Sequence, residues 1–316
     1  MSDGTIHASA SFDEERFVHE LHKALSAKTV NHDVIIDYLV KINNPQRQML
    51  RTPYKQHYAA DLETVLTKEL KGELEHVIVS LIQTPPKADA VALQKTVKGL
   101  GTDEKALIEI LTTRNNEEIE AARNTYYTLY NRTLEDAITA DTSGDFRSML
   151  LQLCRGQREH GTLTDNFVAK QIANDLNAGV DKKERFNKFR FLSELNSNQL
   201  QRVFAEYEKV SGKTFDKFLE KEFSGDGKDL MLAMAQVAKN KPLFFAQQIH
   251  NAVKGFGAKH HDLIRILVSR SEIDLEAIKA EYEKAYGKTL LDTIKSETKG
   301  DYKNALVALV IGNRKN

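Results

Sequence analysis

The chain has 316 residues, of which 41% are hydrophobic and 28% are charged, and only five are proline, a composition typical of a helical globular protein. Its 45 basic and 45 acidic residues cancel, so the sequence lacks the basic footprint of a nucleic-acid-binding protein or a polybasic lipid anchor. An anionic partner would therefore need a bridging cation.

The single cysteine and the N-terminus indicate a cytoplasmic protein. One cysteine, Cys154, excludes an intrachain disulfide framework and fits a reducing compartment. Because it follows the apolar run 149–153, we expect it to pack in the core rather than act as a nucleophile. Residues 1–13 do not resemble a secretory signal, and no apolar run approaches the ~20 residues of a membrane-spanning helix.

Four copies of one pattern follow each other along the chain, at 41–81, 113–153, 194–234 and 269–309. The second and fourth copies align without a gap, and the other two share their frame more weakly. In this frame the equivalent tyrosines are Tyr54, Tyr126, Tyr207 and Tyr282, and the equivalent glycines are Gly72, Gly144, Gly225 and Gly300. Internal repetition at this period predicts an array of similar structural units.

The repeats divide the chain into a tail at 1–12, repeats I to IV at 13–84, 85–156, 167–241 and 242–316, and a linker at 157–166. The linker prediction rests on the polar, glycine-containing stretch Gly156–Asn166, which we interpret as a connection between two halves. The tail offers no amphipathic helix long enough to indicate a protein partner.

Within each repeat the apolar periodicity is helical throughout, so we expect an all-α protein with five short helices in each repeat. Paired capping residues mark the helix starts: Asn115 with Glu118, Thr133 with Asp136, Ser271 with Asp274, and Thr289 with Asp292. Pro53 falls where the other repeats continue a helix, and it predicts a kink because proline has no amide hydrogen.

A glycine loop with a distant acid is the strongest chemical signal. Val97–Thr102 reads Val-Lys-Gly-Leu-Gly-Thr, and 253–258 reads Val-Lys-Gly-Phe-Gly-Ala. Asp141 and Glu297 each follow the second glycine of their loop by 40 residues. Loop carbonyls with one returning carboxylate suit calcium, which takes about six to eight oxygen ligands. A nucleotide-binding loop is not indicated, because no strand precedes and no Gly-x4-Gly-Lys-[Ser/Thr] occurs.

The four-repeat frame, the Lys-Gly-x-Gly loops, and the strings Asp-Thr-Ser-Gly-Asp and Glu-Thr-Lys-Gly-Asp resemble the annexin family. The resemblance extends from about Phe12 to Gly312. It implies a curved disc of four five-helix repeats, with calcium loops on the convex face, that binds phospholipid when calcium is present.

The resemblance also implies a set of ligands. They are the carbonyls of Val97, Gly99 and Gly101 with the carboxylate of Asp141, and the carbonyls of Val253, Gly255 and Gly257 with the carboxylate of Glu297. A secondary calcium position has candidates in Thr102 and Glu104, which Ala258 and His260 replace in repeat IV.

Repeats I and III depart from this pattern. The loop Leu25–Val30 has no glycine, although Glu69 occupies the acid position. The loop Ala178–Lys183 has lysine in place of the second glycine, although Glu222 is present. We expect both sites to be weak or absent.

Four side chains of the intact loops are candidates for lipid contact: Lys98, Leu100, Lys254 and Phe256. The lysines can reach phosphates, and the apolar tips can enter the headgroup boundary. The alternative for the tips is packing against the neighbouring helix.

A further set of charges lies on otherwise apolar helices: Asp89, Glu109, Arg114, Arg265, Arg270 and Asp274. They match positions that line a central polar channel in annexins, and ion conduction has been proposed for the family. We favour the alternative, a set of structural salt bridges. The histidine pairs, His19 with His22 and His260 with His261, lack a third ligand at zinc spacing, so we expect solvated or packed histidines.

Together these features predict a cytoplasmic protein, recruited to membranes when calcium rises, that binds anionic phospholipid through calcium bridges. We see no catalytic arrangement and expect neither an enzyme nor a nucleic-acid binder. Two alternatives remain: a helical-repeat scaffold with vestigial loops, and a membrane-associated ion-conducting protein. The acids paired with the glycine loops favour calcium-dependent phospholipid binding over the scaffold, because a scaffold has no need of them.

Overall fold

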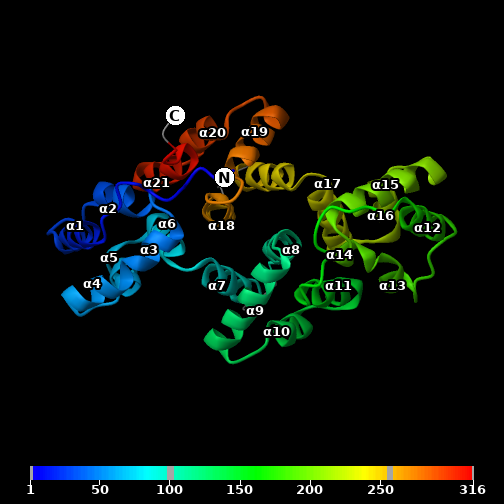
Figure 1. Cartoon of the computed structure of the whole chain (residues 1–316), viewed down its shortest axis with the longest axis horizontal. Helices are drawn as coiled ribbons and strands as arrows, with labels where there is room; N and C mark the ends of the chain where they lie inside the picture. The colour runs from blue at the N-terminus through cyan, green and yellow to red at the C-terminus, as the bar shows by residue number, and fades with distance from the viewer. Residues whose placement is uncertain (1–2, 98–102, 255–258, 315–316) are drawn as a thin grey trace. The chain divides into compact units, whose positions relative to one another are not determined.

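The computed structural model describes residues 3–97, 103–254 and 259–314, and within them it contains helices and no strand (Figure 1). The expected all-α class is therefore confirmed. None of the described helices combines the length and the apolar character needed to cross a membrane. The chain divides into two compact units, residues 1–85 with 245–316 and residues 86–244, which hold repeats I with IV and repeats II with III.

Repeat I comprises α1 Glu14–Ser26, α2 His32–Leu39, α3 Asn44–Met49, α4 Arg51–Tyr58, α5 Leu62–Glu69 and α6 Gly72–Ile82. The helix that contains Pro53 is divided at Leu50 into α3 and α4, while Leu50 keeps helical dihedral angles, and the kink itself stays a prediction. Pro53 cannot donate the hydrogen bond that would continue the helix across Met49.

Repeat II comprises α7 Pro85–Val97, α8 Glu104–Thr113, α9 Asn116–Tyr130, α10 Leu134–Asp141 and α11 Gly144–Cys154. These are the five helices that the periodicity predicts. The capping box of Asn115 and Glu118 is confirmed, as is the cap of Thr133 on the amide of Asp136. Cys154 is buried in α11, as expected.

Repeat III comprises α12 Asn166–Asn177, α13 Arg185–Phe189, α14 Phe191–Glu194, α15 Ser197–Ser211, α16 Phe215–Glu222 and the first part of α17 Gly225–Val253. The helix α17 has a non-helical residue at Asn240, two positions before Pro242. The side-chain oxygen of Asn240 accepts the amide of Leu243 at 2.9 Å and so starts the second part of α17.

Repeat IV continues from the second part of α17 through α18 His260–Arg270, α19 Leu275–Tyr286, α20 Leu290–Glu297 and α21 Gly300–Ile311. The predicted cap of Thr289 on Asp292 is confirmed. The predicted cap of Ser271 is wrong, because α19 begins only at Leu275. Ser271 instead donates its hydroxyl to the carbonyl of Val268, and Arg270 holds the carboxylate of Asp274 at 2.8 Å.

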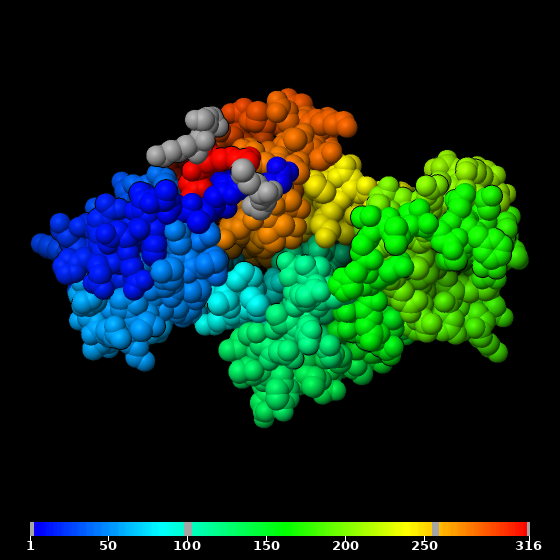
Figure 2. Space-filling model, in the orientation of Figure 1, coloured from blue at the N-terminus to red at the C-terminus, as the bar shows by residue number. Residues whose placement is uncertain are grey.

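In the unit of repeats I and IV, α6 packs against α18 and α21. The N-terminal segment lies beside α21 and the turn that follows α18, and Figure 2 shows it in blue beside the red atoms of α21. Thr5 is fully buried, and its hydroxyl donates to the carbonyl of Leu309 at 2.6 Å. The buried guanidinium of Arg47 lies 3.3 Å from Glu272. Repeats distant in sequence thus share one core.

In the unit of repeats II and III, α11 packs against α13 and α14. The stretch Gly156–Asn166 lies inside this unit, so it joins two repeats of one unit rather than two halves of the chain. It is held by Arg158, whose guanidinium donates to the carbonyls of Leu192 and Leu195 at 3.0 and 2.7 Å. The predicted linker 157–166 thus connects repeats II and III within this unit.

Candidate metal site

The four predicted acids occupy equivalent positions in the structure. Each is the last residue of an eight-residue helix: Glu69 of α5, Asp141 of α10, Glu222 of α16 and Glu297 of α20. Three residues beyond each acid a glycine with φ between +55° and +63° begins the next helix. The local fold therefore presents one carboxylate at the same turn of every repeat.

A buried tyrosine connects this acid to the first helix of the repeat. Tyr126 of α9 is 1% exposed, and its hydroxyl donates to the side chain of Gln94 in α7, one turn before Val97. Burial raises the pKa of Tyr126, and the nearby carboxylate of Asp141 adds to this increase. The end of α7 and the acid therefore lie in one neighbourhood.

The same tyrosine–acid neighbourhood recurs in the other repeats. Burial raises the pKa of each tyrosine and the acid contributes, in the pairs Tyr54 with Glu69, Tyr207 with Glu222, and Tyr282 with Glu297. This proximity could not be read from the sequence, although the alignment places both residues at fixed offsets.

A backbone hydrogen bond closes the interhelical loop in three repeats. The amide donates to a carbonyl seven residues earlier, in the pairs Asn31 to Ala24, Asp103 to Thr96, and Lys259 to Ala252, at 3.1, 3.1 and 2.7 Å. In repeat I this closure is made without a glycine. Repeat III is different, because its loop returns through a bond from the amide of Gly179 to the carbonyl of Leu176 at 3.2 Å.

The acids differ in exposure. Asp141 and Glu297 are exposed, and neither forms an ion pair with any residue that the structure describes. Glu69 and Glu222 are half-buried, and Glu69 lies 3.6 Å from the ammonium of Lys68. An exposed carboxylate without a cationic neighbour is a suitable ligand for a hard cation.

A buried threonine follows each exposed acid. The hydroxyls of Thr142 and Thr298 donate to the carbonyls of Ile138 and Ile294, each at 2.6 Å. These bonds close the last turn of α10 and α20 and fix the direction in which the chain leaves the acid. Repeats I and III have Leu70 and Phe223 at this position. Sequence reasoning missed this role, although the shared threonine was visible.

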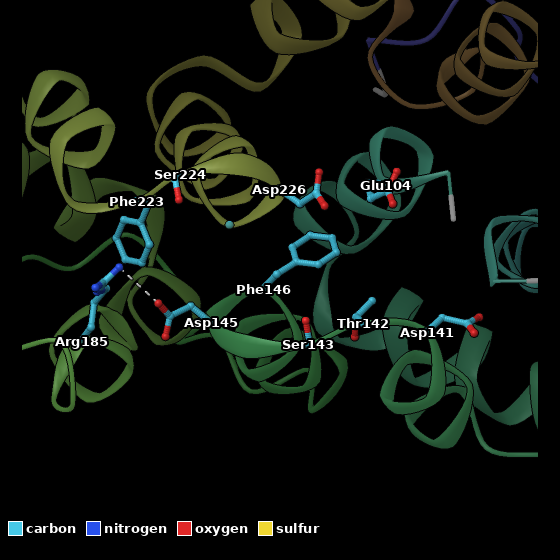
Figure 3. A pocket seen from close by; sticks show the side chains of 11 residues that line it. Glu104, Asp141, Thr142, Ser143, Asp145, Phe146, Arg185, Phe223, Ser224 and Asp226 are labelled. Atoms are coloured by element: carbon cyan, nitrogen blue, oxygen red, sulfur yellow. Dashed lines mark ion pairs between the residues drawn. The ribbon is translucent and has the colours of Figure 1, made fainter. Parts of the chain in front are cut away.

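A cavity of about 300 Å³ opens beside the acid of repeat II. It is lined by Glu104, Asp141, Thr142, Ser143, Asp145, Phe146, Arg185, Phe223, Ser224, Asp226 and Gly227. Figure 3 shows Glu104 and Asp141 at one end and Arg185 with Phe223 at the other. The structure thus brings together two predicted ligands, Glu104 and Asp141, and places a repeat III guanidinium in the same cavity.

Most residues of the two glycine loops lie outside the described residues. These are Lys98, Gly99, Leu100, Gly101 and Thr102 in repeat II, and Gly255, Phe256, Gly257 and Ala258 in repeat IV. Of the predicted carbonyl ligands, Val97 is half-buried at the end of α7 and Val253 is buried at the end of α17, and the neighbouring Lys254 is exposed. Their roles stay predictions.

A family model described as Annexin matches residues 16–81, 88–153, 173–234 and 244–309, and each segment lies within one predicted repeat. The chain belongs to the annexin family. Annexin A1 of Homo sapiens is 42% identical over 306 residues, which cover 96% of this annexin and 88% of that protein.

Solved structures give the same result. Annexin III matches with a TM-score of 0.95 and 37% identity over 98% of both chains. A calcium-bound annexin (Sm)1 matches with a TM-score of 0.88 and 31% identity, covering 98% of this annexin and 93% of that chain. Calcium-dependent phospholipid binding is a general property of the family, whose members are generally non-enzymatic membrane-binding proteins.

The charges predicted to line a channel or form salt bridges include several ion pairs. In this annexin the guanidinium of Arg114 binds both oxygens of Asp89 at 2.9 and 2.8 Å, and both residues are buried in the unit of repeats II and III. Burial opposes ionisation of Arg114, but Asp89 and the buried Glu109 outweigh it and raise its pKa.

The predicted charges of repeat IV also have partners within their own unit. Arg270 binds both oxygens of Asp274 at 2.8 and 2.9 Å, and it lies over the ring of Phe245. Arg265 lies 3.0 Å from Asp262. The four predicted histidines are in packed or partnered positions; for example, His22 stacks on Tyr58, and His260 bonds to the hydroxyl of Tyr302.

Proposed function

We propose that this annexin binds anionic phospholipid membranes reversibly when calcium is present, mainly through repeats II and IV. The observation that carries the proposal is the exposure of Asp141 and Glu297, each at the end of a short helix and without a cationic partner in the described residues. The calcium-bound state of the related annexin (Sm)1 supports calcium as the ion.

The donor chemistry of these residues fits calcium. Each exposed carboxylate offers two oxygens, and the loops that begin at Val97 and Val253 would add the carbonyls of Gly99, Gly101, Gly255 and Gly257. A calcium ion held by these oxygens would keep coordination positions open for a lipid phosphate oxygen. This bridge explains how a chain with zero net charge would bind an anionic surface.

The remaining residues of the proposed site act on the lipid or on the acid. Lys98 and Lys254 would reach lipid phosphates, and Leu100 and Phe256 would enter the headgroup boundary. Thr142 and Thr298 hold the turn that presents the acid. Glu104, with Thr102, would complete a secondary position in repeat II. We infer in addition that the protein is cytoplasmic and that calcium recruits it to membranes.

The test is a calcium titration of binding to vesicles of phosphatidylserine and phosphatidylcholine. We expect Asp141→Asn combined with Glu297→Gln to reduce pelleting to the level measured with a chelator, at calcium concentrations that saturate the original protein. Each single variant retains one site and should need more calcium. Far-UV circular dichroism should not change, because both side chains are exposed.

A matched control is Asp136→Asn combined with Asp292→Asn. These exposed acids lie in the first turns of the same two helices, at the end opposite the proposed ligands. The control removes the same charge and should bind vesicles as the original protein does. Full calcium-dependent binding by the Asp141 and Glu297 double variant would contradict the assignment.

A further inference from the structure

The interhelical loop of repeat III contains its own cation. The ammonium of Lys188 in α13 lies 2.9 Å from the carbonyl oxygen of Gly179, 3.3 Å from that of Asp175, and 3.2 Å from the carboxylate of Asp175. In repeats II and IV the carbonyls of the corresponding loop are the predicted calcium ligands. In repeat III a lysine binds the carbonyl of Gly179 in the loop and that of Asp175 in the last turn of α12.

A second fixed cation occupies the acid turn of repeat III. The guanidinium of Arg185 donates to the backbone carbonyl of Glu222 at 2.8 Å and lies 3.4 Å from Asp145. It also lies over the ring of Phe223, 5.4 Å from the centroid. In repeat II this turn presents an acid without a cationic partner. In repeat III an arginine holds the equivalent turn.

With these two cations engaged, the tip of the loop presents two further lysines. Lys182 and Lys183 are exposed, and neither forms an ion pair with a residue that the structure describes. The turn is held by Asp181, whose carboxylate accepts the amide of Lys183 at 2.9 Å. Residues 178–190 carry five basic side chains, and three of them are paired with acids outside this range: Arg185 with Asp145, Lys188 with Asp175, and Arg190 with Glu194.

The loop end of repeat III lies on the same side of its unit as the proposed site of repeat II. Arg185, two residues after Lys183, lines the cavity that Asp141 and Glu104 also line (Figure 3). A membrane bound at Asp141 would therefore come close to the basic loop.

We propose that repeat III contacts the anionic headgroups of the membrane directly through Lys182 and Lys183, without a calcium ion. Lys188 and Arg185 hold the loop in place of the metal. The proposal rests on the proposed calcium-dependent docking of repeats II and IV, to which it adds a salt-sensitive attraction. A lysine near an anionic surface strengthens binding about fivefold, and the effect decays within a Debye length.

The test compares vesicle partition coefficients at one fixed, subsaturating calcium concentration. The variant is Lys182→Gln with Lys183→Gln, and the matched control is Lys213→Gln with Lys217→Gln. The control lysines are exposed; Lys213 lies just before α16 and Lys217 lies in its first turn. At the helical rise per residue, Lys217 is about 8 Å along the helix from Glu222 at the other end. On phosphatidylserine vesicles at low salt, we expect partition to fall about 25-fold for the first variant and little for the control.

The difference in partition between the two variants should depend on salt concentration and not on the calcium sites. The difference between the two variants should shrink at high salt, while both still pellet with calcium. Equal partition of the two variants at low salt would overturn the proposal and leave the calcium sites intact. Failure of the original protein to bind with calcium would instead overturn the proposed function, and this proposal with it.

A second measurement uses the original protein and a reagent that acetylates amines. Vesicle binding should protect Lys182 and Lys183 and leave Lys213 and Lys217 reactive. As a control, acetylation of the same lysines is measured in chelator without vesicles, once in inorganic phosphate and once in chloride of equal ionic strength. Protection by phosphate alone would assign the loop to a free anion and contradict a membrane contact.

Discussion

At the scale of single residues, the environment of Cys154 gives a direct prediction. Burial raises the pKa of its thiol to about 12 from 9.0, so the folded chain keeps the proton at a pH where the unfolded chain releases it. Rising pH therefore favours unfolding from about pH 9 upward, and Tyr54, with its pKa raised to about 12, adds to the effect above pH 10.

We expect a thiol-specific reagent to leave the native protein unlabelled at pH 8 and to label it fully in urea. The urea midpoint should fall between pH 9 and pH 11, and Cys154→Ala should make this fall smaller. Rapid labelling of the folded protein would show that the thiol is accessible.

Other single residues show what the sequence could and could not predict of the site. The positions of Asp141 and Glu297 followed from their offset to the glycine loops, and the structure places both at helix ends. The capping role given to Ser271 was wrong, because local spacing does not reveal that Arg270 binds Asp274 and delays the start of α19. Contacts of this kind depend on tertiary packing.

At the scale of helices, the glycine after each acid has a measurable cost of replacement. Gly144 has φ of +61°, a conformation that side chains with a Cβ disfavour, and nothing lies within 4 Å of an added Cβ. Gly144→Ala should therefore lower the free energy of unfolding by about 1–2 kcal/mol through backbone strain alone. Urea denaturation followed by circular dichroism measures this change.

Gly227→Ala is the matched control. Gly227 lies in the first turn of α17, in the same unit, with its nearest neighbour 4.0 Å from an added Cβ. Here alanine should stabilise the protein by up to about 1 kcal/mol, because glycine disfavours a helix. A similar loss of stability in both variants would contradict the role given to the positive φ.

The helices themselves were largely predictable, because apolar periodicity and capping residues are local signals. A kink near Pro53 was expected from the chemistry of proline. The division between α13 and α14 could not be expected from the sequence, because it depends on the hydrogen bonds that Ser193 forms. Its amide and its hydroxyl both donate to the carbonyl of Arg190, at 3.0 and 2.8 Å, which tightens the turn.

At the scale of the whole molecule, the pairing of repeats could not be read from their order. Repeat I shares a unit with repeat IV, through contacts such as Arg47 with Glu272 and Thr5 with Leu309. The residues in each contact are more than 200 positions apart, so no local pattern identifies them. The same packing places Gly156–Asn166 within one unit.

The central claim is that calcium controls membrane binding by this annexin. The most direct measurement is co-sedimentation of the unmodified protein with vesicles of phosphatidylserine and phosphatidylcholine, first with calcium and then after excess chelator. The proposed function predicts that the protein pellets with calcium and returns to the supernatant in chelator. Equal pelleting in chelator, or no pelleting at saturating calcium, would contradict it.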